Sequence, residues 1–262
     1  MVQEPHNTEA LQKLTARLVA THPVGRKLML IGGFRYRFLN NSVRTSDDID
    51  YHWSGEFEQK QADLVSFLNR VVVPAARRLM DYDGTAAPCH GQDAESPAVR
   101  IVDLAFWRTG VANSRIEIPI EITRIMCADA VNIRTVEGTI YSTASDADMI
   151  ESKVLAVLNR TILRHRDLVD LFLFRDHLRP DSRQRIAAKT QALGISSDQA
   201  SKRLGDLHAH ADDHGHATQA VIDSQIDSPA AAQLNDAGGG KLVMASVLEL
   251  LDEIVEVRDE SV

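Results

Sequence analysis

Two aspartates separated by one residue, Asp48 and Asp50, follow a glycine pair in the segment LMLIGGFRYRFLNNSVRTSDDIDYHW (28–53). Residues two apart in an extended strand project from the same face, so these carboxylates can converge. Mg²⁺ takes oxygen ligands and is usually held by one or two carboxylates together with substrate phosphates. The spacing therefore indicates a divalent-metal site suited to nucleotidyl transfer, where two ions can stabilise the attacking and leaving oxygens.

The glycine pair fits the same chemistry. Gly32 and Gly33 lack a Cβ, so backbone N–H groups there can approach a triphosphate closely before a helix begins. Arg44, ahead of the acids, either contacts a phosphate or pairs with Asp47. Two adjacent glycines also mark ordinary turns, and an acid-x-acid triplet occurs by chance, so other features of the chain must decide.

The elements around these residues can be predicted from periodicity. A first helix is expected with Asn7 or Thr8 as its cap and with His22-Pro23 at its end. A buried strand at 27–31, a helix at 57–80 and a mobile loop at 81–97 follow. The order is strand, glycines, helix and acidic strand.

Strands are expected at 99–107 and 115–124. In the second, isoleucines at every other position form a core face and leave Glu117 and Glu121 on the opposite face. Both glutamates are candidates for a third acid of the metal site, and a solvent-exposed polar face is the alternative for each. Pro119 suggests an edge position or a bulge.

From Ser145 onward the pattern becomes helical, with Ser145 as a cap. This change predicts two domains, 1–144 and 145–262, and an α+β fold with a mixed β-sheet flanked by helices and a mainly helical C-terminal region. The ranges expected to be helical are 146–160, 163–178, 182–193, 197–207 and 242–257, with a partly flexible stretch at 209–240.

The segment MIESKVLAVLNRTILRHRDLVDLFLF (149–174) resembles the motifs of AbiEii-type toxin nucleotidyltransferases, in which a lysine helix precedes an arginine-aspartate helix. With the glycine pair and RTSDDID, four motifs occur in order over about 28–178, which is more specific than any single motif. The resemblance implies the nucleotidyltransferase fold. It also implies the toxin half of a toxin-antitoxin pair.

The resemblance also implies roles for individual residues. Gly32 and Gly33 match the phosphate-contacting turn, Asp48 and Asp50 the metal ligands, and Glu121 the third acid, preferred over Glu117 because the family places that acid late in the strand. Lys153 matches a lysine that neutralises phosphate charge, and Asp167 and Asp170 match the RDxxDL run, on one helix face. In the alternative, Lys153 is a surface lysine, Asp167 belongs to a helix ion pair, and Arg166 pairs with Asp170.

Two departures from the family pattern bear on activity. Gly33 stands where the family often has serine, so a hydroxyl contact to phosphate is lost unless a backbone N–H replaces it. Leu168 and Val169 stand where an aromatic residue is frequent between the helical aspartates.

Composition narrows the functional class. The formal charge of −8 argues against a protein that coats nucleic acid. Residues 160–189, however, hold eight Lys or Arg and four Asp, which suggests either a basic face for RNA or a solvated helix of mixed charge. No apolar run of about 18 residues and no signal-peptide pattern occurs, so no membrane association and a cytoplasmic location are expected.

The cysteines and histidines carry weaker indications. Cys89 and Cys127 lack a CxxC spacing and are expected to be reduced thiols. The run HAHADDHGH holds His208, His210, His214 and His216, and the i,i+4 pair of His210 and His214 could bind zinc or nickel. The polar residues around it favour instead a solvated segment without preorganised ligands.

Together these features predict a Mg²⁺-dependent nucleotidyltransferase, with a two-ion site, that moves an NMP from NTP to a hydroxyl on RNA (tRNA included) or on a protein. Glu121 would aid deprotonation of that hydroxyl, and a cognate antitoxin would be a partner. The alternatives are transfer to a small molecule such as an aminoglycoside, and a catalytically silent nucleotide-binding protein.

Overall fold

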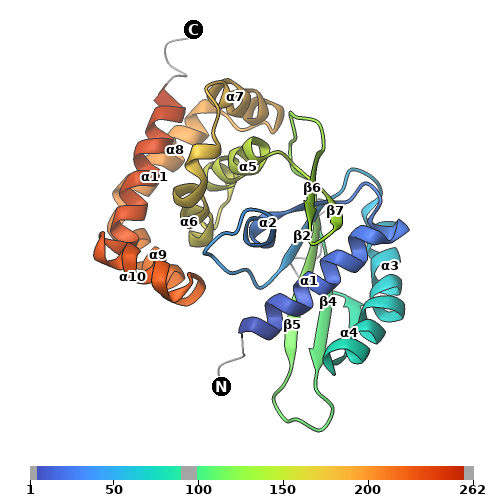
Figure 1. The fold of residues 1–262 in the computed structure, drawn as a ribbon. Helices are drawn as coiled ribbons and strands as arrows, with labels where there is room; N and C mark the ends of the chain where they lie inside the picture. The colour runs from blue at the N-terminus through green and yellow to red at the C-terminus, as the bar shows by residue number, and fades with distance from the viewer. Residues whose placement is uncertain (1–4, 90–98, 257–262) are drawn as a thin grey trace. The chain divides into compact units, whose positions relative to one another are not determined.

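The computed structural model describes residues 5–89 and 99–256 (Figure 1). The chain divides into two compact units: Met1–Ile125 with Ala130–Ala144, and Met126–Asp129 with Ser145–Val262. The chain therefore crosses between the units three times, at 125/126, 129/130 and 144/145.

The first unit is built on a seven-stranded mixed sheet in the order β3-β4-β5-β2-β1-β7-β6. The β1–β7 and β2–β5 pairs are parallel and the other four are antiparallel. This sheet and its flanking helices confirm the predicted fold class. The strands are β1 (Met29–Ile31), β2 (Ile49–His52), β3 (Asp83–Pro88), β4 (Val99–Trp107), β5 (Ile116–Thr123), β6 (Asn132–Val136) and β7 (Thr139–Thr143).

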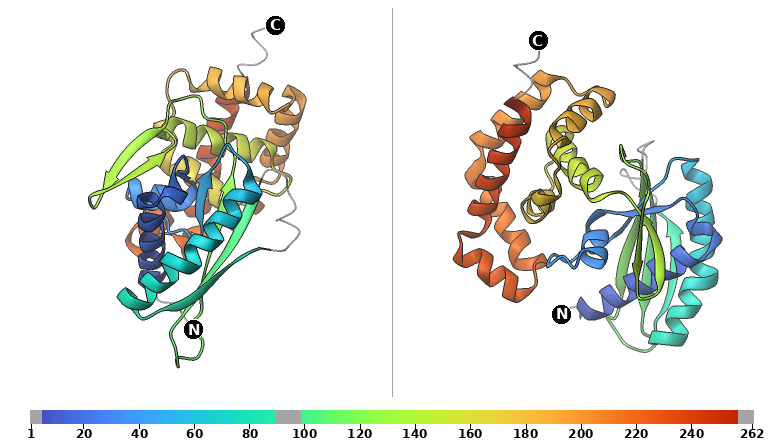
Figure 2. Two further views of the ribbon diagram at one scale, coloured as in Figure 1. Left: turned by 90° about the vertical axis from the view of Figure 1, so that its right-hand side faces the viewer. Right: turned by 45° about the horizontal axis from the view of Figure 1, so that its top comes forward.

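One face of this sheet is covered by helices that come before and after β2. They are α1 (Pro5–Thr21), α3 (Phe57–Phe67), the π-helical turn η2 (Leu68–Val72) and α4 (Val73–Met80). The right-hand view of Figure 2 shows α3 and α4 beside the sheet. The wide turn η2 precedes Pro74, whose ring nitrogen has no hydrogen to donate in a regular helix. The expected helix at 57–80 is therefore confirmed with one irregular turn.

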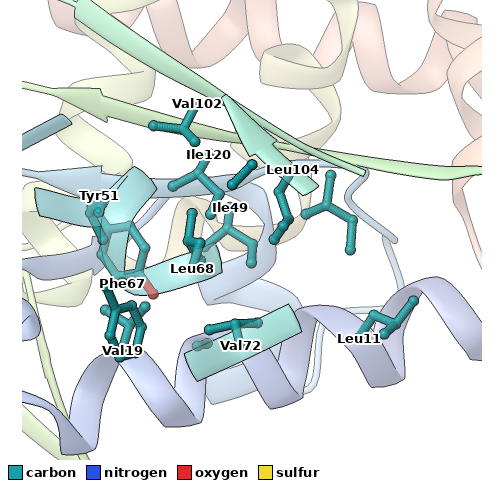
Figure 3. Close-up of a cluster of buried hydrophobic side chains, with 14 of the residues drawn as sticks. Leu11, Val19, Ile49, Tyr51, Phe67, Leu68, Val72, Val102, Leu104 and Ile120 are labelled. Atoms are coloured by element: carbon teal, nitrogen blue, oxygen red, sulfur yellow. The ribbon is translucent and has the colours of Figure 1, made fainter. Parts of the chain in front are cut away.

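The sheet and these helices enclose the apolar core of the first unit (Figure 3). Ile49 and Tyr51 of β2 and Ile120 of β5 are buried in it. Fully burying one such side chain stabilises the fold by about 1.5–3 kcal/mol. Because side chains alternate along a strand, this burial directs Asp50 and Glu121 to the other face, as the isoleucine pattern predicted for β5.

Several expectations for the first unit are wrong. Asn7 and Thr8 lie inside α1, which extends back to Pro5. The segment expected to be a loop contains β3, which pairs along its length with β4 through its backbone and so needs no apolar pattern; residues 90–98 of that segment lie outside the described residues.

Two features of the sheet near β5 were also not predicted correctly from the sequence. The hairpin β6–β7 was not predicted. Pro119 lies in a strand flanked on both sides, not at an edge; the ladder with β2 begins only at Ile120, so the missing N–H falls beyond its end.

The second unit is helical, as expected, and Ser145 caps its first helix by accepting a hydrogen bond from the backbone N of Asp148 at 3.0 Å. The short turn η4 (Arg175–His177) follows the second helix. The helices are α5 (Asp146–Asn159), α6 (His165–Phe174), α7 (Ser182–Ala192), α8 (Ser197–Ala209), α9 (Ala211–Gln225), α10 (Ser228–Asp236) and α11 (Gly239–Glu256).

The partly flexible stretch expected at 209–240 is instead helical, and this prediction is wrong. Its glycines serve packing: a Cβ at Gly240 would overlap the carbonyl oxygen of Gly215 and come within 2.6 Å of the Gln219 nitrogen. The glycines therefore allow α9 and α11 to approach backbone to backbone. Among the described residues, no helix has the length and apolar content needed to cross a membrane.

Candidate functional site

The glycine pair begins α2 (Gly32–Leu39) directly after β1, and it lies against the acidic residues of the next strand. Gly32 has a φ of +75°, and a Cβ at this position would overlap the carboxylate of Asp50. β1 pairs with β2 so that Ile31 is opposite Asp50. The requirement for glycine is therefore twofold, since both the backbone angle and the space exclude a side chain.

Gly33 is in contact with the loop that leads to Asp48. A Cβ there would lie 2.7 Å from Ser46 Oγ and would overlap the guanidinium of Arg44. Ser46 Oγ donates a hydrogen bond to Asp48 Oδ1 at 2.5 Å. Gly32, Gly33, Arg44, Asp48 and Asp50, predicted from separate motifs, are thus brought together in one place.

Arg44 and its loop are held in place by hydrogen bonds within the first unit. Arg44 is only 2% exposed, and its Nη1 donates to the Thr45 carbonyl at 2.9 Å. Gln12 of α1 donates through Nε2 to the Ser46 carbonyl at 2.7 Å and to the Asp48 carbonyl at 3.3 Å. The sequence did not indicate Gln12 or Ser46 as part of this site. A single glutamine in an amphipathic helix gives no signal. Ser46, two residues before Asp48, could have been proposed as a hydrogen-bond donor to that aspartate.

The strand register separates the two glutamate candidates. Asp50 of β2 is directly opposite Glu121 of β5 in a parallel pair, so both project from the same face. Glu117 lies four residues earlier, before β5 begins to pair with β2, and it is exposed and bound to Arg115 at 2.7 Å. Glu121, not Glu117, is therefore the glutamate beside Asp50.

His52 follows Asp50 on the same face of β2, and no sequence motif indicated a role for it. Its Nδ1 accepts a hydrogen bond from the Ile125 backbone N at 3.0 Å. Burial, then the charge of Arg124, lowers its pKa, which keeps the ring neutral. Within 5–89 and 99–256, no three His, Cys, Asp or Glu side chains form a group that could hold a metal ion. The first unit thus offers paired carboxylates, which Mg²⁺ commonly supplements with substrate phosphates.

In the second unit, the lysine and arginine-aspartate motifs meet as a buried ion cluster between α5 and α6. Lys153 Nζ lies 2.6 Å from Asp167 Oδ1 and 2.9 Å from Asp170 Oδ2. Both aspartates reach the same amine, as expected for residues three apart on one helix face. Lys153 is 14% exposed and is not the surface lysine of the alternative reading.

Asp167 also binds Arg160, so two cations serve one buried carboxylate. Burial by itself would raise the pKa of Asp167, but the charges of Lys153 and Arg160 outweigh it and hold the pKa below its usual value. The carboxylate is therefore ionised at neutral pH and keeps the Lys153 amine in place.

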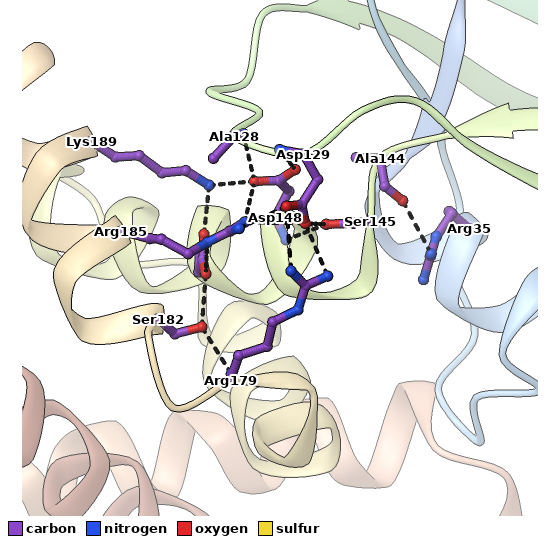
Figure 4. Close-up of polar contacts among 11 residues, drawn as sticks. Arg35, Ala128, Asp129, Ala144, Ser145, Asp148, Arg179, Ser182, Arg185 and Lys189 are labelled. Carbon is purple, nitrogen blue, oxygen red and sulfur yellow. Dashed lines mark hydrogen bonds and ion pairs between the residues drawn. The ribbon is translucent and has the colours of Figure 1, made fainter.

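A second buried ion cluster lies between α5 and α7 (Figure 4). Lys189 donates to Asp148 and to Glu151 at 2.6 Å each, and Arg185 reaches the same two carboxylates and Asp129 at 2.7–2.9 Å. Asp148 in turn accepts hydrogen bonds from the backbone N atoms of 128 and 129 at 2.8 and 3.0 Å. This cluster fixes the crossing segment 126–129 to the second unit.

The basic segment at 160–189 is accordingly not one solvated basic face. Arg185 and Lys189 point into the buried cluster, and Arg160 binds Asp167. Arg183 binds Glu253 at 2.9 Å, and Arg179 binds Asp129 at 3.0 Å. The net charge of a segment did not show which face its side chains occupy, because their partners come from other helices.

Comparison with known proteins shows the fold. No protein-family model and no curated protein matches the sequence. A "putative nucleotidyltransferase" from H. pylori superposes with a TM-score of 0.56 at 16% identity, covering 99% of this chain and 98% of its own. JHP933 from Helicobacter pylori gives 0.53 at 18% identity, over 100% and 97% of the two chains. At these identities, the likeness shows that the chain has the fold of these proteins.

A third comparison concerns MenT4, a nucleotidyltransferase toxin from Mycobacterium tuberculosis. It gives a TM-score of 0.47 at 15% identity, over 80% of this chain and 66% of its own. This score is too low to support an argument from MenT4 to this chain.

Proposed function

We propose that this chain is a nucleotidyltransferase that moves a nucleoside monophosphate from an NTP to a hydroxyl group on an RNA or a protein and releases pyrophosphate. The observation that carries the proposal is the cross-strand pair of Asp50 and Glu121 beside the turn at Gly32. The shared fold with the H. pylori proteins supports it.

Asp48 and Asp50 would hold Mg²⁺ through carboxylate oxygens, together with oxygens of the triphosphate, and Glu121 would be the third acid of the set. The chemistry of these side chains fits this ion, since carboxylates supply hard oxygen ligands, and triphosphate oxygens would complete a site that the described residues do not close by themselves. When bound, Mg²⁺ supplies charge neutralisation at the phosphates, and two ions would do so at both the attacking and the leaving oxygen.

Residues of the chain itself would carry out the proton transfer and bind the phosphates. Glu121 takes the proton of the acceptor hydroxyl as the hydroxyl oxygen bonds to the α-phosphorus. At the same time, the bond from that phosphorus to the oxygen bridging to the β-phosphate breaks. Pyrophosphate leaves with the electron pair of this bond. Backbone N–H groups at Gly32 and Gly33 bind phosphate oxygens at the start of α2, and Arg44 adds positive charge behind them.

The role of Lys153 rests on the family resemblance, which implies that its amine neutralises charge on the phosphates and the departing pyrophosphate. Asp167 and Asp170 support this role because they fix the amine at 2.6 and 2.9 Å. Both are therefore positioning residues for Lys153.

A toxin role, with a cognate antitoxin encoded nearby, follows from the same resemblance. Expression of the chain alone should then arrest growth, and expression of Asp50→Ala should not. Arrest that persists in the mutant would contradict a catalytic toxin.

The direct test uses each of the four NTPs labelled at the α-phosphate, with Mg²⁺ and with total RNA, a protein extract or an aminoglycoside as the acceptor. Label is expected in RNA or in protein. Label in the aminoglycoside alone would favour the small-molecule alternative. If no acceptor is labelled, NTP binding without transfer would favour a silent nucleotide-binding protein, and a chain that neither transfers nor binds NTP would overturn the proposal.

A further inference from the structure

Two histidines from different helices of the second unit face each other with their ring nitrogens. His165 is the first residue of α6, and His214 lies in the first turn of α9. His165 Nε2 and His214 Nδ1 are 3.2 Å apart, and the ring centroids are 5.4 Å apart. Only His214 was among the histidines singled out in the sequence, because its partner is 49 residues away.

This distance matches a chelating pair. Two imidazole nitrogens bound to one tetrahedral zinc ion at about 2.0–2.1 Å are about 3.3 Å apart, which follows from the tetrahedral angle. A neutral pair at the same distance shares one N–H between the two nitrogens. Moving that proton to the other ring nitrogen of its own imidazole would present both lone pairs to an ion.

The surroundings keep the pair neutral, as a metal ligand must be. Burial lowers the pKa of His165, and the neighbouring His214 lowers it further. Burial also lowers the pKa of His214, with smaller contributions from Arg203 and His210, while Asp213 acts in the opposite direction. Both rings are half-buried, so water and ions can reach them.

A third imidazole is close by on the same helix. The ring centroid of His210 is 6.4 Å from that of His214, and His210 Nδ1 is held at 2.9 Å from the Asp206 carbonyl oxygen. The structure has no three-residue ligand group among its described residues, so His210 is outside bonding distance here. A rotation of its exposed side chain could bring it nearer.

We propose that His165 and His214 form a binding site for a divalent transition-metal ion such as Zn²⁺ or Cu²⁺, with water or His210 in the remaining coordination positions. This site joins α6 to α9. It is independent of the Mg²⁺ chemistry proposed above, because imidazole nitrogen favours transition metals whereas Mg²⁺ prefers oxygen ligands. The ion would stabilise α6 at the end next to Asp167.

The site can be tested by calorimetric titration of the whole protein with Zn²⁺ at neutral pH. One saturable event is expected, weakened about tenfold or more in His165→Ala and in His214→Ala. His216→Ala is the matched control, since His216 is exposed on the same helix two residues further along and should leave the affinity unchanged. His214→Asn separates chelation from folding, because it can still hydrogen-bond to His165 but lacks the imidazole.

Two further readouts do not depend on activity. Zn²⁺ should raise the melting temperature of the wild type but not of His214→Asn, because an ion that binds only the folded state stabilises it. Cu²⁺ bound to the wild type should show coupling to at least two nitrogens in its paramagnetic resonance spectrum. Absence of saturable binding, or equal binding by the wild type, His165→Ala and His214→Asn, would overturn the proposal and leave a hydrogen-bonded pair.

Discussion

The carboxylate of Asp50 occupies the space that the Cβ of any other residue at position 32 would need. This relationship joins two motifs that are 18 residues apart in the sequence, and it places the acid of β2 at the start of α2. It also explains why this helix begins with glycine, although glycine weakens helices by about 1 kcal/mol relative to alanine.

Gly32→Ala should therefore abolish nucleotidyl transfer and destabilise the first unit. Gly138→Ala is the matched control, because Gly138 has nearly the same φ (+74° against +75°) but nothing within 4 Å of the added Cβ. The control should lose only about 1–2 kcal/mol for the left-handed backbone. Urea unfolding and labelled-NTP transfer measure both effects; equal losses in the two variants would show that the space beside Asp50 is not restrictive.

Ser46→Ala should lower the rate of transfer about tenfold while leaving the fold intact. The hydroxyl of Ser46 donates to Asp48 at 2.5 Å, and without it the carboxylate loses its orientation. A rise in the Mg²⁺ concentration needed for half-maximal rate is the expected kinetic signature. Ser66→Ala, on α3, should change neither quantity, and an unchanged Mg²⁺ requirement in Ser46→Ala would contradict a positioning role.

Lys153→Met should destabilise the second unit by about 3–5 kcal/mol, because it leaves two buried carboxylates without their shared cation. Adding Asp170→Leu to Lys153→Met should recover part of that loss, since the buried charge of one carboxylate that has lost Lys153 is then removed. Urea unfolding of the single and double variants measures the coupling. A loss in Lys153→Met below about 1 kcal/mol, as for an exposed ion pair, would contradict burial of the cluster.

The second unit should lose stability in acid. Burial by itself would raise the pKa of Asp148 and of Asp167. Hydrogen bonds from backbone N–H groups and from Lys189 bring the pKa of Asp148 below its usual value. The charges of Lys153 and Arg160 do the same for Asp167. Well above the usual aspartate pKa of about 3.9, both carboxylates are ionised whether folded or unfolded, and their contribution to stability is fully present.

Below that pH the unfolded chain takes up protons first, so the contribution falls as pH drops toward the folded-state pKa values. Urea midpoints followed by circular dichroism between pH 6 and pH 3 should show this decline. Asp148→Asn should be less stable at pH 6 and show a shallower decline, whereas Asp212→Asn, on the exposed side of α9, should follow the wild type. An identical decline in Asp148→Asn would contradict the assignment.

Local spacing was sufficient to predict which residues of the first unit lie together at the candidate site. The glycines, Asp48 and Asp50 are connected by one strand-helix-strand passage, and the alternation of β5 placed Glu121 on the correct face. The register between β2 and β5 could not be predicted, because it depends on a pairing between segments about 70 residues apart. For the same reason, the sequence left Glu117 and Glu121 as alternatives.

Contacts between distant helices account for most of what the sequence did not reveal. Lys189 binds Asp148, 41 residues away in the sequence, and His165 contacts His214, 49 residues away. No spacing rule connects the two members of either pair. β3 is held by backbone pairing, which side-chain patterns do not report. Gly215 and Gly240 lie in the stretch 209–240 that was expected to be partly flexible, although together they form a close helix contact.

The role of the Asp50–Glu121 pair is tested most directly by comparing the rate of NMP transfer in Glu121→Gln with the rate in Glu117→Gln. These changes remove the same charge from the same strand, but only Glu121 is opposite Asp50. We expect a loss in kcat of about 10²–10⁴ for Glu121→Gln, the range for removal of a general base, and a rate within about twofold of wild type for Glu117→Gln. Equal rates in the two variants, or a larger loss in Glu117→Gln, would rule out Glu121 as the base.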